Sequence, residues 1–402
     1  MTHVVVIGAG QAGSSCVAKL RNGGFDGKIT LIGAEPVPPY QRPPLSKAYL
    51  LGDMAVERLF LRPEAFYSDH QIELRMNARV EAIDTAAQTI KVAGEVIAYG
   101  NLVLTTGSVP RRLPTSIGGD LEGVHVVRDL ADVDAMGPRF VKGARVLIVG
   151  GGYIGLEAAA VASKLGLNVT LVEAAERILQ RVAAPETSDF FRKLHSRHGV
   201  EIREGVGLER LLGDRVVTGA KLSDGSEIAA DFVIAGVGIM PDTALAEAAG
   251  LETDNGIKVD AQGRTSAAHV WAAGDCTSFP YKDGRIRLES VPNAIDQAEV
   301  VAQNLMGAAL AYQAKPWFWS DQYDVKLQIA GLNTGYDRVV TRLTGSDTVA
   351  FWYYRGETLL AVDAMNDPRG YMVGKRLIES GRSPSAEVVA DPQTDLKALL
   401  KA

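Results

Sequence analysis

The fold of this chain is decided by the stretch Val4-Val5-Val6-Ile7-Gly8-Ala9-Gly10-Gln11-Ala12-Gly13. An apolar run of strand length breaks into a Gly-x-Gly-x-x-Gly turn, and apolar residues follow at helical spacing. This pattern is typical of a dinucleotide cradle, in which Gly8 permits the tight turn, Gly10 lets the backbone approach a pyrophosphate, and Gly13 allows helix and strand to pack closely. The N-terminus of the helix would face the phosphates.

A carboxylate follows the cradle at the expected distance. A second apolar strand, Ile29 to Ile32, ends just before Glu35. Glu35 lies about 20 residues after Gly13, where an acid can hold ribose hydroxyls. The sequence therefore predicts a nucleotide at the centre of the first domain.

Length and composition set the broad class. At 402 residues the chain exceeds what one hydrophobic core usually supports, so we expect two or three domains. Hydrophobic residues make up 47% and charged residues 22%, as in a soluble globular protein. No apolar run approaches the ~18 residues of a membrane span. No secretory signal is visible, so we expect a cytoplasmic location.

Cysteine content and net charge argue against a disulfide-rich protein, a thiolate metal protein and a general nucleic-acid-binding protein. Cys16 and Cys276 are too few and too far apart for a disulfide framework or a thiolate metal site, and we expect both to be small apolar filler. The net charge of −6 argues against general nucleic-acid binding.

A proline-rich passage, Pro38 to Lys47, comes next. Its four prolines predict a stiff extended segment that delivers Lys47 to a defined place. By itself such a passage could equally be a spacer or a ligand for a partner.

The opening pattern then recurs. The strand Arg145 to Val149 runs into Gly150-Gly151-Gly152-Tyr153-Ile154-Gly155, and strong helix formers follow. A further strand ends at Glu173, again where a ribose acceptor belongs. A carboxylate there would repel a 2′-phosphate, which favours NADH over NADPH, although Arg177 is nearby. Two dinucleotides are therefore expected to bind.

A later segment returns toward the first nucleotide. The apolar run from Asp231 to Val237 ends in glycines and Pro241 and predicts a return between domains. Further on, Gly274-Asp275 follows a strand, and an acid there can accept a hydrogen bond from a polyol hydroxyl, although a plain Gly-Asp turn is also possible.

In this order the motifs resemble the two-dinucleotide flavoprotein reductases, and within them the NADH-dependent ferredoxin reductases of the putidaredoxin reductase type. The resemblance covers essentially the whole chain. It is most specific in four strings: Pro43-Pro44-Leu45-Ser46-Lys47-Ala48-Tyr49-Leu50, Gly150-Gly151-Gly152-Tyr153-Ile154-Gly155-Leu156-Glu157, Glu289-Ser290-Val291-Pro292-Asn293-Ala294 and Pro316-Trp317-Phe318-Trp319-Ser320-Asp321-Gln322-Tyr323.

The resemblance implies a fold, a reaction and partners. The fold would be α/β, with two Rossmann-like domains of the glutathione-reductase type and a C-terminal α+β domain. The reaction would transfer a hydride from NADH to FAD and then single electrons to a 2Fe-2S ferredoxin. That ferredoxin would supply a haem monooxygenase or a ring-hydroxylating dioxygenase. No metal, nucleic acid or membrane partner is implied.

Site residues are also implied by the resemblance. FAD would be held by Gly8, Gly10, Gly13, Glu35, Lys47, Val80, Arg128, Asp275 and Val291. NADH would be held by Gly152, Ile154, Gly155, Glu157, Glu173 and Gly238. The expected catalytic residues are Lys47, Glu157 and Trp319. Lys47 and Glu157 would meet beside the flavin, because an ammonium near N5 favours the negative charge of reduced flavin. Trp319 would lie against the flavin and bridge electron exit.

Three residues depart from the family pattern. Ala34 stands where the putidaredoxin enzyme has an acid, so Glu35 alone would serve the ribose. Gln328 and Glu299 stand where that enzyme has basic residues thought to meet its ferredoxin. We expect docking to use other basic residues, with Arg62, Lys326, Lys375 and Arg376 as the candidates.

The motif order and the resemblance together predict three domains. The FAD domain is expected at 1–110 and 242–320, the NADH domain at 111–241 and the C-terminal domain at 321–402. Within the last, strands on either side of Arg355-Gly356-Glu357-Thr358 predict a hairpin, and Asp395 to Ala402 predicts a short helix. His195 and His198 have helical spacing, but no Cys or third His stands near them in sequence, so we expect an exposed helix face.

Two other functions stay open. A flavin enzyme that reduces disulfides, peroxides or oxygen needs a reactive cysteine near the flavin, and Tyr40 to Lys47 contains none. A flavoprotein resembling apoptosis-inducing factor, in which NADH switches partner contacts, would need basic surface stretches or a targeting sequence. Neither is apparent in the sequence.

Overall fold

The computed structural model describes residues 3–401, and these form two compact units. The first unit contains the residues up to Arg42, then Ala55–Val109 and Ile239–Pro316. The second unit contains Pro43–Met54, Pro110–Gly238 and the residues from Trp317 onward. Both units are therefore assembled from segments that are far apart in the sequence.

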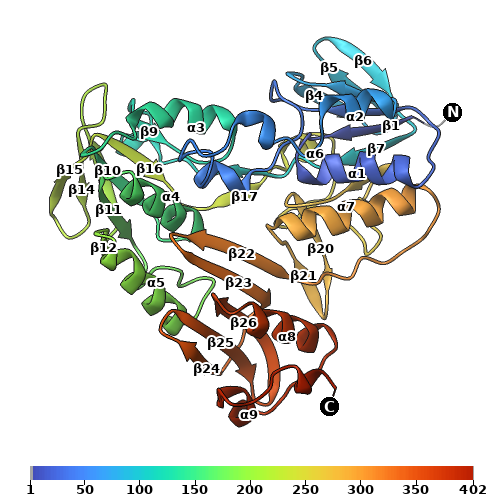
Figure 1. Cartoon of the computed structure of the whole chain (residues 1–402). Helices are drawn as coiled ribbons and strands as arrows, with labels where there is room; N and C mark the ends of the chain where they lie inside the picture. The colour runs from blue at the N-terminus through green and yellow to red at the C-terminus, as the bar shows by residue number, and fades with distance from the viewer. Residues whose placement is uncertain (1–2, 402) are drawn as a thin grey trace. The chain divides into compact units, whose positions relative to one another are not determined.

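The first unit is built on a parallel sheet of five strands in the order β19-β7-β1-β2-β3. The strands are β1 (Val4–Ile7), β2 (Ile29–Ile32), β3 (Ile72–Arg75), β7 (Asn101–Leu104) and β19 (Val270–Ala272). Helices α1 (Gln11–Asn22) and α7 (Val291–Leu305) lie side by side (Figure 1). A strand order that reverses at β1 is that of a dinucleotide-binding fold.

The apolar run at the start of the chain is explained by burial on both faces of this sheet. Val5 and Ile7 belong to one buried cluster, whereas Val4 and Val6 belong to another. Because successive side chains of a strand point to opposite faces, a strand covered on both sides needs apolar residues at every position. Cys16 and Cys276 are buried in these two clusters, which confirms their prediction as filler.

Smaller elements complete the first unit. They are an antiparallel sheet of β4 (Val80–Asp84), β5 (Thr89–Val92) and β6 (Glu95–Ala98), a sheet of β18 (Ile257–Lys258), β20 (Thr277–Tyr281) and β21 (Gly284–Ile286), helices α2 (Glu64–Asp69) and α6 (Ala244–Ala248), and the boundary strands β8 (Ser108–Pro110) and β17 (Ile239–Pro241).

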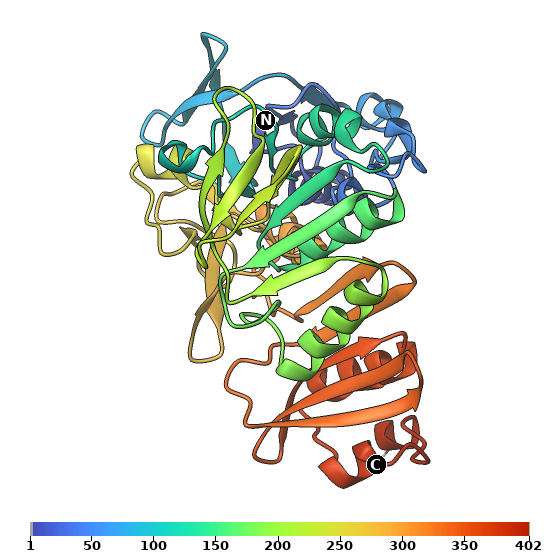
Figure 2. The same ribbon diagram turned by 90° about the vertical axis from the view of Figure 1, so that its left-hand side faces the viewer.

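The second unit contains another parallel sheet of five strands, in the order β12-β11-β10-β16-β9. The strands are β9 (Val124–His125), β10 (Arg145–Val149), β11 (Asn168–Glu173), β12 (Glu201–Glu204) and β16 (Phe232–Ala235). Helices α4 (Tyr153–Lys164) and α5 (Pro185–Arg197) pack against it (Figure 2). The remaining elements here are α3 (Leu130–Met136) and the strands β13 (Leu208–Leu212), β14 (Gly219–Leu222) and β15 (Glu227–Ala229).

The C-terminal part of this unit is an antiparallel sheet in the order β22-β23-β26-β25-β24. The strands are β22 (Trp317–Gln322), β23 (Val325–Gly331), β24 (Arg338–Gly345), β25 (Thr348–Arg355) and β26 (Thr358–Met365), with helices α8 (Pro368–Glu379) and α9 (Ala386–Ala390). Arg355 pairs with Thr358, which confirms the predicted hairpin. The predicted terminal helix is wrong as an α-helix, because only a 3₁₀ turn, Ala398–Leu400, forms; Ala402 lies outside the described residues.

The proline-rich passage also differs from its prediction. Pro43–Ser46 is a 3₁₀ helix rather than an extended segment, and the amide of Lys47 donates to the carbonyl of Pro44 at 3.0 Å. Prolines suit the first turn of a helix as well as an extended chain, because that turn leaves its amides without helical partners. Lys47 is nevertheless held in a defined place, as predicted.

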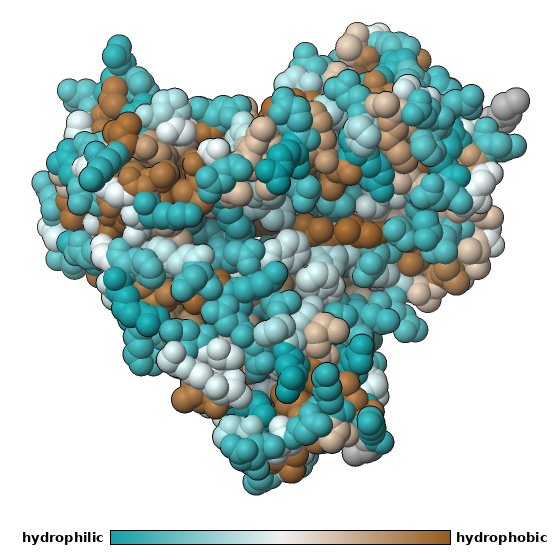
Figure 3. Space-filling model, in the orientation of Figure 1, coloured by the Kyte–Doolittle hydropathy of each residue, from teal (hydrophilic) through white to brown (hydrophobic). Residues whose placement is uncertain are grey.

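The face of the molecule drawn in Figure 3 is mostly polar. Hydrophilic residues cover most of the face in Figure 3, with apolar residues in small groups between them. Within residues 3–401, none of the helices is both long enough and apolar enough to cross a membrane.

Arg342 ties the C-terminal sheet to the end of the chain. This strand β24 residue is only 4% exposed, and its guanidinium donates to the carbonyls of Val389, Asp391, Pro392 and Thr394. Four peptide carbonyls thus accept hydrogen bonds from a buried guanidinium. Within residues 3–401, Arg342 forms no salt bridge with a carboxylate.

Arg342→Met is expected to loosen this sheet. The change leaves the four carbonyls without their donor and should lower the free energy of opening of β24 and β25 by about 3 kcal/mol. Native-state hydrogen exchange of the strand amides measures this quantity. Arg338→Met, on the same strand but partly exposed, should change it by less than about 1 kcal/mol. Equal effects of the two changes would contradict the assignment.

Candidate functional site

The first glycine cradle has room for a ligand. A Cβ atom on Gly8, which has φ +112°, would lie 2.1 Å from the carbonyl oxygen of Thr105, and one on Gly13 would lie 2.0 Å from that of Gly8. A Cβ on Gly10 would meet no protein atom within 4 Å. Gly8 and Gly13 are therefore required by packing, whereas Gly10 borders open space at the N-terminus of α1, where a pyrophosphate can bind.

Glu35 follows β2 and is held by two neighbours. The hydroxyl of Tyr40 donates to Oε2 at 2.5 Å, and the guanidinium of Arg42 donates to Oε1 at 2.5 Å. Both partners come from the proline-rich passage, and sequence reasoning did not assign them a role. They orient the carboxylate while each oxygen keeps a lone pair for a ribose hydroxyl.

The other predicted FAD contacts are divided between the two units. Asp275 accepts a hydrogen bond from the Ser108 hydroxyl at 3.3 Å, and a Cβ on the adjacent Gly274 would lie 3.0 Å from Cβ of Ala12, so this turn packs on α1. Val80 begins β4 and Val291 begins α7, both in the first unit. Lys47 and Arg128 belong to the second unit.

The second cradle repeats the geometry of the first. A Cβ on Gly150, which has φ +106°, would lie 2.4 Å from the carbonyl oxygen of Gly236, and one on Gly155 would lie 2.2 Å from that of Gly150. A Cβ on Gly152 would meet no protein atom within 4 Å. Ile154, at the start of α4, is 44% exposed. The N-terminus of α4 is therefore as accessible to phosphates as that of α1.

Glu173 is fixed at the rim of the second cradle. Its Oε2 accepts from the amide of Gly151 at 2.7 Å, and its Oε1 accepts from the amide of Ala175 at 2.8 Å. Arg177, which qualified the NADH prediction, donates to the hydroxyl of Ser188 at 2.6 Å. The arginine is thereby bound to helix α5, whereas the carboxylate stays at the glycine turn of the cradle.

Gly238 and Trp319 complete the predicted set in the second unit. Gly238 has φ +95°, and a Cβ there would lie within 4 Å of the side chains of Arg111 and Arg181. Trp319 lies on β22, its ring centroid 5.7 Å from that of Trp317. Trp317 packs on the C-terminal core, and Trp319 is only partly buried.

Lys47 and Glu157 form an ion pair, as the resemblance implied. Nζ of Lys47 lies 2.6 Å from Oε2 of Glu157, whose side chain is 2% exposed. The hydroxyl of Ser46 donates to the same oxygen at 2.7 Å, and the hydroxyl of Ser320 donates to Oε1 at 2.7 Å. Sequence reasoning missed both serines, although they lie in two of the strings that carried the resemblance. The carboxylate is thus buried and paired, and each of its oxygens has at least one donor.

His195 contradicts the prediction of an exposed helix face. It is fully buried, and its Nε2 lies 2.8 Å from Oε1 of Gln322, because β22 and the loop after it cover this side of α5. His198 is exposed, and its ring stacks on Tyr323 with centroids 3.6 Å apart. Over residues 3–401, no group of three or more potential ligands has the geometry to hold a metal ion.

The basic residues considered for docking have different surroundings. Arg62 donates to the Ser14 hydroxyl at 2.7 Å, and Lys375 pairs with Glu379 one helical turn away. Lys326 and Arg376 are exposed.

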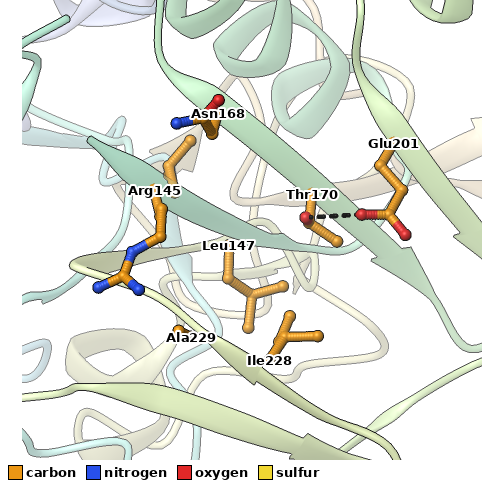
Figure 4. A pocket seen from close by; sticks show the side chains of 8 residues that line it. Arg145, Leu147, Asn168, Thr170, Glu201, Ile228 and Ala229 are labelled. Atoms are coloured by element: carbon orange, nitrogen blue, oxygen red, sulfur yellow. Dashed lines mark hydrogen bonds between the residues drawn. The ribbon is translucent and has the colours of Figure 1, made fainter. Parts of the chain in front are cut away.

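A cavity of about 360 Å³ in the second unit is not the nucleotide site. It is lined by Arg145, Val146, Leu147, Asn168, Thr170, Glu201, Ile228 and Ala229. Figure 4 shows its walls, including the Thr170 hydroxyl that donates to Glu201 at 3.2 Å. Arg145, Asn168 and Glu201 begin their strands, whereas nucleotides bind at the carboxyl ends of parallel strands.

Comparisons with known proteins agree with this geometry. Residues 2–298 match the family described as pyridine nucleotide-disulphide oxidoreductase, and residues 317–400 match the reductase C-terminal family. The chain is 46% identical to the ferredoxin–NAD(P)(+) reductase of a Sphingomonas species, over 98% of this chain and 97% of the relative. It is 39% identical to putidaredoxin reductase of Pseudomonas putida, over 100% of this chain and 97% of the relative.

Solved structures give the same result. The reductase chain of a covalent putidaredoxin reductase–putidaredoxin complex superposes with a TM-score of 0.96 at 38% identity, and the match covers 100% of this chain and 98% of that one. A ferredoxin reductase from Rhodopseudomonas palustris gives 0.95 at 40% identity, covering 99% of each chain. These matches confirm the predicted fold class and the resemblance. The chain therefore belongs to the pyridine nucleotide-disulphide oxidoreductase family, among its ferredoxin reductases with a dedicated C-terminal domain.

Proposed function

We propose that this protein is an NADH-dependent reductase that binds FAD at the first cradle and NADH at the second, and that passes electrons singly to a 2Fe-2S ferredoxin of an oxygenase system. The proposal is carried by the repetition, in one chain, of two cradles whose central glycines, Gly10 and Gly152, border open space. Relatives named as ferredoxin reductases, aligned over nearly their full length, support the choice of acceptor.

The residues present fit both nucleotides. Gly8, Gly10 and Gly13 would admit the pyrophosphate of FAD, Glu35 would accept from its ribose, and Asp275 would accept from its ribityl chain. In the second cradle Gly152, Ile154 and Gly155 would receive NADH, with Glu173 on the ribose and Gly238 near the nicotinamide end. Val80, Arg128 and Val291 would add further FAD contacts.

The Lys47–Glu157 pair is proposed to act at the flavin. Bound FAD would supply the conversion of a two-electron donor into two single-electron transfers, chemistry that no side chain offers. The ammonium of Lys47 would stabilise the negative charge that reduction adds, and Glu157 would keep the lysine in one position. Glu157 is only 2% exposed, so little water competes for its ion pair with Lys47.

The thiol-based alternative has little support. Burial raises the pKa of the Cys16 thiol to about 12 and that of the Cys276 thiol to about 11. A nucleophilic cysteine needs the opposite shift.

The domain plan predicted from the sequence and a cytoplasmic location belong to the same proposal. The separate match of residues 317–400 supports the former, and the two free cysteines are in keeping with the latter.

Electron exit through Trp319 tests the proposed function. Trp319→Ala should lower NADH-driven reduction of a 2Fe-2S ferredoxin by about 10-fold while changing turnover with ferricyanide by less than about 2-fold, because a small diffusible acceptor needs no docking surface. Phe318 points to the opposite face of β22, and its ring lies 5.0 Å from that of Tyr153 beside the second cradle. Phe318→Ala should therefore affect both acceptors in the same proportion.

The docking surface is proposed to include Lys326 and Arg376, because both are exposed whereas Lys375 is paired. Ferredoxin turnover should then weaken as salt is raised. Failure of the wild-type protein to reduce any ferredoxin with NADH would overturn the proposed function. Equal losses with both acceptors in Trp319→Ala would limit Trp319 to packing.

A further inference from the structure

A line of buried hydrogen bonds runs from the Lys47–Glu157 pair to helix α5. Ser320 donates to Oε1 of Glu157 at 2.7 Å, and Nε2 of Gln322 donates to Oγ of Ser320 at 3.1 Å. Oε1 of Gln322 lies 2.8 Å from Nε2 of His195. Ser320, Gln322 and His195 are all at most 1% exposed, so water does not compete for these contacts.

Every member of this line lies in the second unit. The line ends at Tyr323. Nδ1 of His195 lies 3.3 Å from the hydroxyl of Tyr323, whose ring stacks on that of His198. Tyr323 has φ +56° in the two-residue turn between β22 and β23, a position at which Asn or Gly is usual.

The donors in this line must all point one way. An ionised carboxylate can only accept hydrogen bonds, and a serine hydroxyl has one hydrogen to donate. Ser320 must therefore donate its hydrogen bond to Glu157. Gln322 must then present its NH₂ group to Ser320 and its carbonyl oxygen to His195. The imidazole must in turn donate from Nε2, which leaves Nδ1 to accept from Tyr323.

His195 is neutral in this arrangement. Burial lowers the pKa of His195 to about 4, so the ring carries one N–H at neutral pH and has to choose a tautomer. A neutral imidazole can carry its hydrogen on Nδ1 or on Nε2. The donor directions in this line permit only the Nε2–H tautomer.

We propose that the charge on Glu157 sets the direction of the whole line and that Gln322 and His195 are positioning residues for the Lys47–Glu157 pair. They hold the Ser320 hydroxyl on Glu157 and thereby keep this carboxylate in place for Lys47. The inference deepens the proposed function, because the reaction it serves is reduction of the flavin by NADH.

The tautomer of His195 provides a test that does not depend on the reaction. Long-range ¹⁵N–¹H spectra distinguish the two tautomers, and the chain has only six histidines. The wild-type protein with its FAD should show His195 as the Nε2–H form. The His195→Gln variant identifies the signals, because they disappear in it.

Glu157→Gln should reverse the line. The carbonyl of the new amide is needed by Lys47 and Ser46, so its NH₂ group faces Ser320. Ser320 then donates to Gln322, the amide of Gln322 turns over, and His195 has to accept at Nε2 and carry its hydrogen on Nδ1. The expected result is a switch of His195 to the Nδ1–H form.

A matched change provides the control. Glu204 also places a carboxylate against α5, where it binds Arg192 at 2.7 Å, but it has no part in the line. Glu204→Gln should leave His195 in the Nε2–H form. An unchanged tautomer in Glu157→Gln, or a switch in Glu204→Gln, would overturn the proposal, whether or not the protein reduces a ferredoxin.

Kinetics provide a second measurement if Glu157→Gln does not fold. Ser320→Ala should slow reduction of the flavin by NADH about 10-fold, because it removes a charge-assisted hydrogen bond from the buried carboxylate. Gln322→Met should slow it about 3-fold alone and should add nothing in the Ser320→Ala background, since it acts through that serine. His198→Phe keeps the ring stacked on Tyr323 and should leave the rate unchanged. Additive losses in the double variant would show that Gln322 acts independently and would contradict the proposal.

Discussion

In the Lys47→Met variant, NADH is expected to reduce the bound flavin about 100-fold more slowly than in the parent protein, because the preorganised charge that stabilises the reduced form is lost. Stopped-flow bleaching of the flavin absorbance measures this step directly. Lys164→Met removes an exposed lysine from the end of α4, the helix that carries Glu157, and should leave the rate within about 2-fold.

A second variant separates charge from folding. Lys47→Met leaves a buried carboxylate without its cation, which could cost about 3 kcal/mol of stability and some FAD content. The double variant Lys47→Met with Glu157→Gln has no uncompensated charge and should regain the lost stability and FAD. Its flavin should still be reduced slowly. Recovery of the rate along with the fold would assign Lys47 a structural role.

The preference for NADH over NADPH is expected to fall about 100-fold in Glu173→Ala, measured as the ratio of the two kcat/KM values. Glu173 is held by the amides of Gly151 and Ala175 at the rim of the cradle, so its charge cannot move away from a 2′-phosphate. NADH binding should also weaken, because the ribose loses its acceptor.

Glu176→Ala is the control for this experiment. Glu176 lies three residues further on and is exposed, so its removal changes the net charge equally without touching the ribose position. The ratio should remain within about 2-fold of the wild-type value. A wild-type protein that prefers NADPH would contradict the assignment of Glu173 outright.

Much of the fold was predictable because its signals are local. The two cradles show themselves in short stretches, where an apolar strand, a glycine turn and a helix follow one another directly. Glu35 and Glu173 could be proposed for the same reason, since Glu35 lies just after the next strand of its cradle and Glu173 ends the corresponding strand of the other. The hairpin at Arg355 to Thr358 is local as well.

The parts that were missed depend on contacts between distant segments. His195 was predicted to lie on an exposed helix face because no Cys or third His stands near it in sequence. The residues that cover it, Gln322 and Tyr323, come more than a hundred residues later. Ser46 and Ser320 were missed as partners of Glu157 for the same reason. Pro43–Ser46 was assigned the wrong conformation because proline restricts φ to a value that both extended and helical turns accept.

Two separate pieces of chain supply the partners of a buried carboxylate that lies on a third, and this limits how the gene can be recombined. Ser46 and Lys47 come from the excursion Pro43–Met54, Glu157 comes from the middle of the chain, and Ser320 comes from the C-terminal segment. Consider a chimera that joins the middle of this chain to the first and last thirds of a relative. Glu157 keeps its hydrogen bonds and its ion pair only if the relative's segments contain equivalents of Ser46, Lys47 and Ser320. Crossover points in this family should therefore be placed so that the partners of Glu157 stay together, and not simply at the ends of the sheets.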